Sequence, residues 1–240
     1  MIALGKIGCL LIHGFTGGAY EVNPLARYLR ETTDWIVSVP TLPGHGRNLH
    51  LEDAHAREWL AFAEEELERL WRYCDIVYVV GFSMGGLIAT HLAIHYPVSK
   101  LVLLSTAALY INTGQIFRDL HVMVKDATRR RLHENEWFGH YKYKLLHTPI
   151  RATWEFRKIV LTTRPLLSQI NVPTFIGQGL MDGIVPPKAA RYVYDRIGTY
   201  QKKLYLSQTS KHLICYASDC NDLFGEIAFF LNCEDHPDDG

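Results

Sequence analysis

The chain has 240 residues, of which 48% are hydrophobic and 21% are charged. This composition is ordinary for a globular protein, and it excludes a disordered, a collagen-like or a coiled-coil chain. Lysine plus arginine and aspartate plus glutamate both number 25, so the formal net charge is zero and general binding to nucleic acid is not expected.

No stretch approaches the roughly 18 consecutive apolar residues of a membrane-spanning helix, so we expect no stable membrane insertion. The apolar N-terminal run has its only lysine inside it and no small-residue cleavage site after it. This favours a first strand over a signal peptide. The five cysteines show neither C-x-x-C spacing nor a Cys/His ligand pattern, so we expect reduced thiols, no metal site and a cytoplasmic protein.

Six short apolar segments predict buried strands. Most of them lack a clear alternation of apolar and polar residues, which is typical of strands covered by helices on both faces of a parallel sheet. In chain order they are Lys6–His13, Trp35–Val39, Ile76–Gly81, Lys100–Ser105, Pro173–Gln178 and Lys202–Leu206.

Amphipathic segments between these strands predict helices. Asn23-Pro24 is typical of a helix N-terminus, and it begins the first of them. Strands that alternate with helices indicate βαβ units and an α/β fold with a mostly parallel, doubly wound sheet. The other predicted helices are Glu58–Cys74, Gly85–Tyr96, Pro187–Ile197 and Asn221–Asn232.

The stretch from Ile111 to Gln169 interrupts this alternation, because it contains no strand-like run. It holds 11 lysines and arginines against 5 aspartates and glutamates, whereas the rest of the chain has an acidic surplus. We therefore predict a core formed by residues 1–110 and 170–240 and a helical cap, or lid, inserted at residues 111–169.

The strongest chemical signal follows the third predicted strand. Gly81-Phe82-Ser83-Met84-Gly85 is a G-x-S-x-G pattern between a strand and a helix. A sharp strand-to-helix turn needs small neighbours and exposes the serine hydroxyl beside a helix N-terminus, which favours an anionic oxygen. A glycine-rich turn with an incidental serine is the alternative, but the strand and helix around it favour Ser83 as a nucleophile.

A serine nucleophile needs a base, usually histidine, that a carboxylate orients. In an open α/β sheet, these partners are expected after the carboxyl ends of later strands. Asp182 follows the fifth predicted strand and His212 follows the sixth, so the chain order is Ser, Asp, His, as in α/β-hydrolases. A turn aspartate and a histidine placed by chance are the alternatives, and the agreement of both positions favours a triad.

The negative charge that develops on an attacked carbonyl oxygen needs hydrogen-bond donors. One is expected to be the Met84 backbone N–H, at the start of the helix. The other is expected from the loop after the first strand, where the Phe15 N–H is the natural candidate and Gly14 allows close approach. His13 is interpreted as a support of this loop and not as the base.

These residues lead to a family. The chain resembles the α/β-hydrolase superfamily, in particular small bacterial carboxylesterases and monoacylglycerol lipases. The resemblance implies the same triad and oxyanion donors, and a small helical cap where the insertion lies. Lys211 departs from the family, which usually has glycine before the catalytic histidine. The segments that carry the resemblance are LLIHGFTGGAYEVNPLARYL, VPTLPGHG, VVGFSMGGLIATHLA, VPTFIGQGLMDGIVPP and SKHLI.

The sequence therefore predicts a serine hydrolase that cleaves small or medium acyl esters through an acyl-enzyme. Its partner is a small-molecule ester, and no cofactor is expected, since neither a P-loop nor an H-E-x-x-H pattern is present. Two alternatives stay open, namely an acyl thioesterase with the same triad and a relative of the fold that binds a ligand without turnover. The sequence makes no prediction about oligomeric state.

Overall fold

The computed structural model describes residues 5–109 and 148–233. Its centre is a six-stranded sheet in the order β2-β1-β3-β4-β5-β6, and every neighbouring pair of strands is parallel. This sheet confirms the predicted α/β fold. Its strands are β1 (Ile7–Ile12), β2 (Ile36–Ser38), β3 (Ile76–Phe82), β4 (Lys100–Leu104), β5 (Thr174–Gly179) and β6 (Lys202–Ser207).

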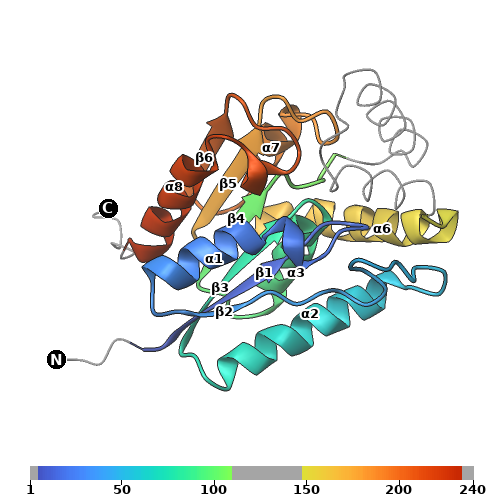
Figure 1. Cartoon of the computed structure of the whole chain (residues 1–240), viewed down its shortest axis with the longest axis horizontal. Helices are drawn as coiled ribbons and strands as arrows, with labels where there is room; N and C mark the ends of the chain where they lie inside the picture. The colour runs from blue at the N-terminus through green and yellow to red at the C-terminus, as the bar shows by residue number, and fades with distance from the viewer. Residues whose placement is uncertain (1–4, 110–147, 234–240) are drawn as a thin grey trace.

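Helices connect the strands and cover both faces of the sheet. In Figure 1, α1 and α8 lie together, away from α2 and α6. The described helices are α1 (Asn23–Thr32), α2 (Ala56–Trp71), α3 (Met84–His95), α6 (Ile150–Thr163), α7 (Lys188–Tyr194) and α8 (Cys220–Asn232), with short 3₁₀ turns at Ala19–Glu21, Arg164–Gln169 and Ile214–Tyr216.

Alternate side chains of each central strand feed two separate apolar layers. On β1, Leu10 and Ile12 belong to the layer shared with α2, α3, α6 and α7. Cys9 and Leu11 belong to the opposite layer, shared with α1 and α8. Because successive side chains of a strand point to opposite faces, a strand covered on both faces must be apolar throughout. This explains why the strands read as continuous apolar runs.

The last part of the predicted insertion lies among the described residues. Helix α6 packs against α2 and α3, and its Phe156, Ile159 and Val160 belong to the apolar layer on that face. Residues 111–147 of the predicted cap lie outside the described residues. The division of the chain into a core and a cap at residues 111–169 therefore stays a prediction.

The strand order creates one distinctive place in the sheet. From β1 the chain runs to β2 on one side and then crosses back to β3 on the other side of β1. In open α/β sheets, ligands bind outside the carboxyl ends of the strands at such a switch point. The carboxyl ends of β1 and β3 lead directly to the Phe15 loop and to Ser83.

Within residues 5–109 and 148–233, no helix is both long and apolar enough to cross a membrane.

Candidate active site

Ser83 occupies a strained turn between β3 and α3. Its φ of 55° and ψ of −114° are unusual for a residue with a side chain, because the Cβ is crowded in that region. The flanking glycines leave no room for a side chain. A Cβ on Gly81 would lie 2.2 Å from the Gly85 carbonyl oxygen, and one on Gly85 would lie 2.2 Å from the Ile12 carbonyl oxygen. The G-x-S-x-G spacing thus follows from the close passage of α3 over β1 and β3.

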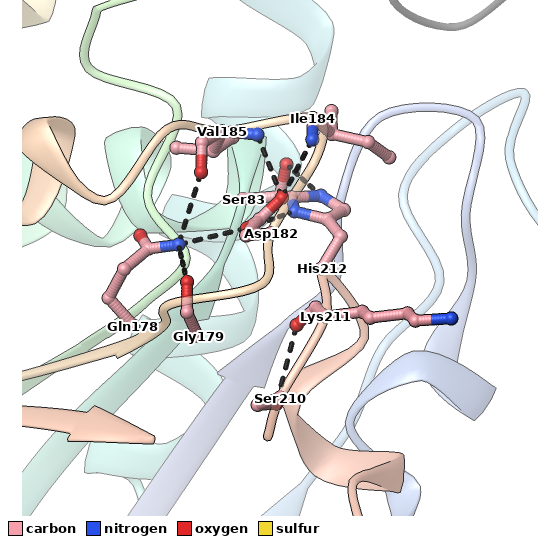
Figure 2. Close-up of polar contacts among 9 residues, drawn as sticks. All are labelled: Ser83, Gln178, Gly179, Asp182, Ile184, Val185, Ser210, Lys211 and His212. Carbon is pink, nitrogen blue, oxygen red and sulfur yellow. Dashed lines mark hydrogen bonds and ion pairs between the residues drawn. The ribbon is translucent and has the colours of Figure 1, made fainter. Parts of the chain in front are cut away.

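The structure brings Ser83, Asp182 and His212 together in a single hydrogen-bonded chain (Figure 2). His212 Nε2 lies 3.2 Å from Ser83 Oγ, and His212 Nδ1 lies 2.8 Å from Asp182 Oδ2. A carboxylate can only accept, so Nδ1 carries the proton and Nε2 is left to accept the serine proton. All three residues are more than 90% buried. This is the geometry of a nucleophile, its base and the group that orients the base.

The Asp182 carboxylate is held by donors from three sides. Its Oδ1 accepts the backbone N–H groups of Ile184 at 2.8 Å and Val185 at 2.9 Å. Its Oδ2 accepts Gln178 Nε2 at 2.9 Å as well as His212 Nδ1. Burial raises the pKa of Asp182, but the charge and hydrogen bond of His212 and the two backbone N–H groups outweigh burial and hold that pKa below its usual range. The aspartate therefore stays ionised inside the protein.

The loop after β1 is fixed by hydrogen bonds that involve His13, Gly14 and Gly17. The Gly14 carbonyl oxygen accepts His13 Nδ1–H at 2.8 Å and the Gly17 N–H at 3.2 Å. His13 Nε2 accepts the Leu42 N–H at 3.0 Å, which places the ring proton on Nδ1. In a planar trans peptide the N–H points opposite to the carbonyl oxygen. The Phe15 N–H is thereby directed away from these partners, and it forms no hydrogen bond within the described residues.

This loop lies directly against the nucleophile. A Cβ on Gly14 would lie 3.1 Å from Ser83 Cβ, so only glycine lets the loop come this close. The Met84 N–H is at the first position of α3, where a helix leaves its amide groups without intrahelical partners. The oxyanion role of the Phe15 and Met84 N–H groups stays a prediction, and it belongs to the proposal below.

Two polar side chains of the site were missed by sequence reasoning. Glu21, which is 1% exposed, accepts the Gly14 N–H at 2.8 Å and so holds the loop from the other side. Gln178, on β5, is fully buried and touches Asp182. Each is a single polar residue among apolar neighbours in the sequence, and this pattern is what could have marked them as buried polar groups with a specific partner.

Lys211, the departure from the family pattern, does not enter the triad. Its side chain points away from Ser83, Asp182 and His212 in Figure 2. Its backbone carbonyl accepts the Ser210 hydroxyl at 3.3 Å. The lysine side chain therefore takes no part in the hydrogen bonds that hold the His212 ring.

Aromatic side chains from α2 and α6 pack against the ring of Phe15. The Phe15 ring stacks on the ring of Phe156 with centroids 5.1 Å apart, and it also contacts Trp59 at 6.0 Å and His45 at 6.1 Å. The side chain of Phe15 is thus held in a cluster of aromatic rings that joins the loop after β1 to α2 and α6.

Comparison with known proteins identifies the family of this chain. The family model described as "Alpha/beta hydrolase family" matches residues 9–210. The chain belongs to the alpha/beta hydrolase family. It is 28% identical over 220 residues to the "Thermostable monoacylglycerol lipase" of Bacillus sp. (strain H-257), a match that covers 87% of this chain and 84% of that protein.

Other members of the alpha/beta hydrolase family match over almost the whole chain. The "Carboxylesterase" of Bacillus subtilis (strain 168) is 23% identical over 230 residues, which are 95% of this chain and 93% of that protein. A solved structure of the metagenome-derived lipolytic enzymes LipS and LipT has a TM-score of 0.77 at 22% identity and covers 96% of this chain and 97% of that one. At this identity the structural match shows the shared fold.

Among the described residues, no group of three or more histidine, cysteine, aspartate or glutamate side chains is placed to hold a metal ion.

Proposed function

We propose that the protein is a serine carboxylic-ester hydrolase that acts on small or medium acyl esters. The observation that carries the proposal is the hydrogen-bonded chain from Ser83 through His212 to a buried, ionised Asp182. Ser83 directly precedes α3, and we propose that the backbone N–H groups of Phe15 and Met84 complete the site as oxyanion donors. The relatives named monoacylglycerol lipase and carboxylesterase support an ester substrate.

The first half of the reaction forms an acyl-enzyme. His212 Nε2 takes the proton of Ser83 Oγ as that oxygen bonds to the ester carbonyl carbon, and the carbonyl oxygen becomes an oxyanion. The N–H groups of Phe15 and Met84 donate to this oxyanion, and each such donor typically contributes about 2.7–4 kcal/mol in the transition state. Asp182 stabilises the imidazolium. The imidazolium then gives its proton to the alkoxide oxygen of the leaving alcohol as the carbon–oxygen bond breaks.

The second half repeats these steps with water as the nucleophile. His212 takes a proton from water as the hydroxide oxygen bonds to the acyl carbon, and it returns the proton to Ser83 Oγ as the carboxylic acid leaves. The protein ends in its starting state. The same steps would cleave a thioester, and a family relative that only binds its ligand would perform neither half.

An apolar acyl chain suits the aromatic wall formed by the partly exposed ring of Phe15, which the buried rings of Trp59 and Phe156 support from behind. Phe156 comes from α6, so the segment between β4 and β5 contributes to this wall. We propose that the inserted segment at residues 111–169 influences which acyl chains are accepted.

The test is a substrate series with a matched inactive variant. p-Nitrophenyl esters from acetate to palmitate, monoacylglycerols and an acyl thioester are offered to the wild-type protein and to Ser83→Ala. We expect hydrolysis of short or medium esters by the wild type only, and labelling of Ser83 by a fluorophosphonate. Faster cleavage of the thioester than of the matched oxygen ester would favour the thioesterase alternative, and a folded protein with neither turnover nor labelling would favour the binding alternative.

A further inference from the structure

Gln178 is an uncharged polar side chain where the fold favours an apolar one. It is fully buried near the carboxyl end of β5, after the buried apolar residues Phe175 and Ile176. Burying an amide is unfavourable unless hydrogen bonds compensate for the lost contact with water. The contacts of Gln178 therefore indicate why the chain keeps it there.

The direction of the Gln178 amide follows from its surroundings. Its Nε2 lies 2.9 Å from Asp182 Oδ2, 3.2 Å from the Val185 carbonyl oxygen and 3.3 Å from the Gly179 carbonyl oxygen (Figure 2). All three neighbours are acceptors. A flipped amide would bring its own oxygen against all of them, so the NH₂ group must face Asp182.

Gln178 donates its hydrogen bond to the same carboxylate oxygen of Asp182 that accepts the N–H of His212. Asp182 Oδ2 accepts both Gln178 Nε2 and His212 Nδ1, while Oδ1 is occupied by two backbone N–H groups. Two donors on one carboxylate oxygen share its electron density, so each bond is weaker than it would be alone. Gln178 therefore acts on His212 through Asp182, without touching the base or the nucleophile.

We infer that Gln178 is a positioning residue that holds Asp182 Oδ2 toward His212 and moderates how strongly Asp182 stabilises the imidazolium. The inference rests on the proposed function, since it describes how the same triad is tuned. A purely structural role is the competing explanation, because the contacts with Gly179 and Val185 also join the end of β5 to the following loop. The two explanations differ in what they predict for the pH dependence of the nucleophile.

The test compares Gln178→Met with Thr174→Val. Methionine fills similar space without a donor. Thr174 is equally buried on the same strand, and its hydroxyl donates to the Val172 carbonyl oxygen, away from the triad. The rate at which a fluorophosphonate labels Ser83 is measured against pH, because this reaction needs the triad but no particular substrate.

The positioning role predicts a shift in one direction. Without the Gln178 donor, Asp182 binds the imidazolium more strongly, so the acidic limb of the labelling profile moves to higher pH by about 0.5 unit. Thr174→Val keeps the wild-type profile. In the proton NMR spectrum of the resting protein, the far-downfield resonance of His212 Nδ1–H moves further downfield in Gln178→Met, since its hydrogen bond strengthens.

Other titratable groups near the triad are the same in every variant. Glu21 lies across Gly14 from Ser83, His13 lies behind the same loop, and Lys211 precedes His212 and points outward. Differences between the profiles of wild type and Gln178→Met therefore report the loss of the amide.

The outcomes separate the inference from the proposed function. Suppose that wild-type Ser83 is labelled, but that folded Gln178→Met has its acidic limb at the same or a lower pH and its Nδ1–H resonance does not move. This result would overturn the positioning role and leave the proposed function intact. A wild-type protein that does not label at Ser83 would instead overturn the proposed function. If Gln178→Met does not fold, Gln178→Asn gives the same comparison, because its amide is one methylene too short to reach Asp182.

Discussion

At the residue scale, Asp182 shows how a buried carboxylate is kept charged. Burial alone would raise its pKa, but the charge and hydrogen bond of His212 and the backbone N–H groups of Val185 and Ile184 outweigh burial, so the pKa lies below the usual range. A carboxylate that is this well solvated by the protein is both a strong partner for an imidazolium and a contributor to the stability of the fold.

We expect Asp182→Asn to lower kcat by about 10⁴-fold, because an amide can donate to His212 Nδ1 and so favours the wrong tautomer. Rates of p-nitrophenyl ester hydrolysis by the purified variant measure this. A loss below tenfold, with folding verified by circular dichroism, would show that Asp182 does not orient His212.

The same residue has a predictable effect on acid stability. Its folded-state pKa is depressed, so its contribution is fully present above the ordinary aspartate range near pH 4 and is lost as pH falls through the folded-state pKa. The difference in unfolding free energy between wild type and Asp182→Asn, from urea melts at several pH values, should therefore shrink below about pH 4. A difference that grows on acidification has the wrong sign for this account.

Two glycines near the site give a matched pair of substitutions. A Cβ on Gly85 would lie 2.2 Å from a backbone oxygen of β1, whereas a Cβ on Gly183 would meet nothing within 4 Å. We expect Gly85→Ala to lose about 3 kcal/mol or more of stability, and Gly183→Ala to be neutral or stabilising by up to about 1 kcal/mol. Thermal unfolding measures the melting temperature of each variant. Equal melting temperatures for the two variants would contradict the close packing of α3 against β1 at the Ser83 turn.

At the element scale, α6 and α2 are tied together by one carboxylate. Glu155 of α6 accepts the backbone N–H of Ala56, the first residue of α2, at 3.1 Å. It also pairs with Lys158, at 2.6 Å. Burial raises the pKa of Glu155, but the hydrogen bonds from Lys158 and Ala56 outweigh it and lower that pKa overall. Glu155 thus adds an acceptor from a distant part of the chain to the capping box that His55 and Glu58 form at the start of α2.

We expect Glu155→Met to destabilise the protein by about 1–2 kcal/mol, the usual loss for a helix cap, because methionine fills similar space without an oxygen to accept the Ala56 N–H. Lys158→Met is the control, because its side chain is 62% exposed and an exposed ion pair contributes only about 0–1 kcal/mol. Urea unfolding at neutral pH measures both. If Lys158→Met were the more damaging substitution, the ion pair rather than the cap would carry the stabilisation.

The boundary of α2 shows where reading a sequence reaches its limit. The apolar stripe predicted a start at Glu58, but the helix begins at Ala56. A capping box between His55 and Glu58 marks this start locally, whereas the partner of the Ala56 N–H lies 99 residues away and is found only in the folded chain. The strands were predicted within one or two residues, because a buried strand is a short apolar run with clear ends, and that signal is local.

At the scale of the whole molecule, topology explains why the triad residues could be proposed from the sequence. Ser83, Asp182 and His212 each follow a strand, and parallel strands place their carboxyl ends at one edge of the sheet. Gln178 and Glu21 could not be found in this way. Glu21 contacts Gly14 and Gln178 contacts Asp182 only because the chain folds that way. Neither the residue types nor their spacing in the sequence predicts these contacts.

The five cysteines allow a test of whether the fold is stable without disulfide bonds. All five are free; Cys9 and Cys215 are buried, and Cys233 is exposed. Burial raises the pKa of the Cys9 thiol to about 12 and also raises the pKa of Cys215. Because the thiolate is the reactive form, we expect a thiol reagent at pH 8 to modify Cys233 rapidly, and Cys9 and Cys215 only after unfolding.

Mass spectrometry of labelled peptides identifies which cysteines react, and a melting curve with and without a reductant completes the test. The melting temperature should not depend on the reductant. Rapid native labelling of Cys9 would mean that the layer between the sheet and α1 is open.

The central claim is that Ser83 carries the acyl group during turnover, and trapping that intermediate tests it most directly. The protein is mixed with an excess of p-nitrophenyl butyrate, quenched in acid within milliseconds to seconds, digested and mapped by mass spectrometry. The account predicts a butyryl group on the peptide that contains Ser83, absent from Ser83→Ala, whose turnover should be about 10⁶-fold lower. Undiminished hydrolysis by Ser83→Ala, or an acyl group trapped on a different residue, would contradict it.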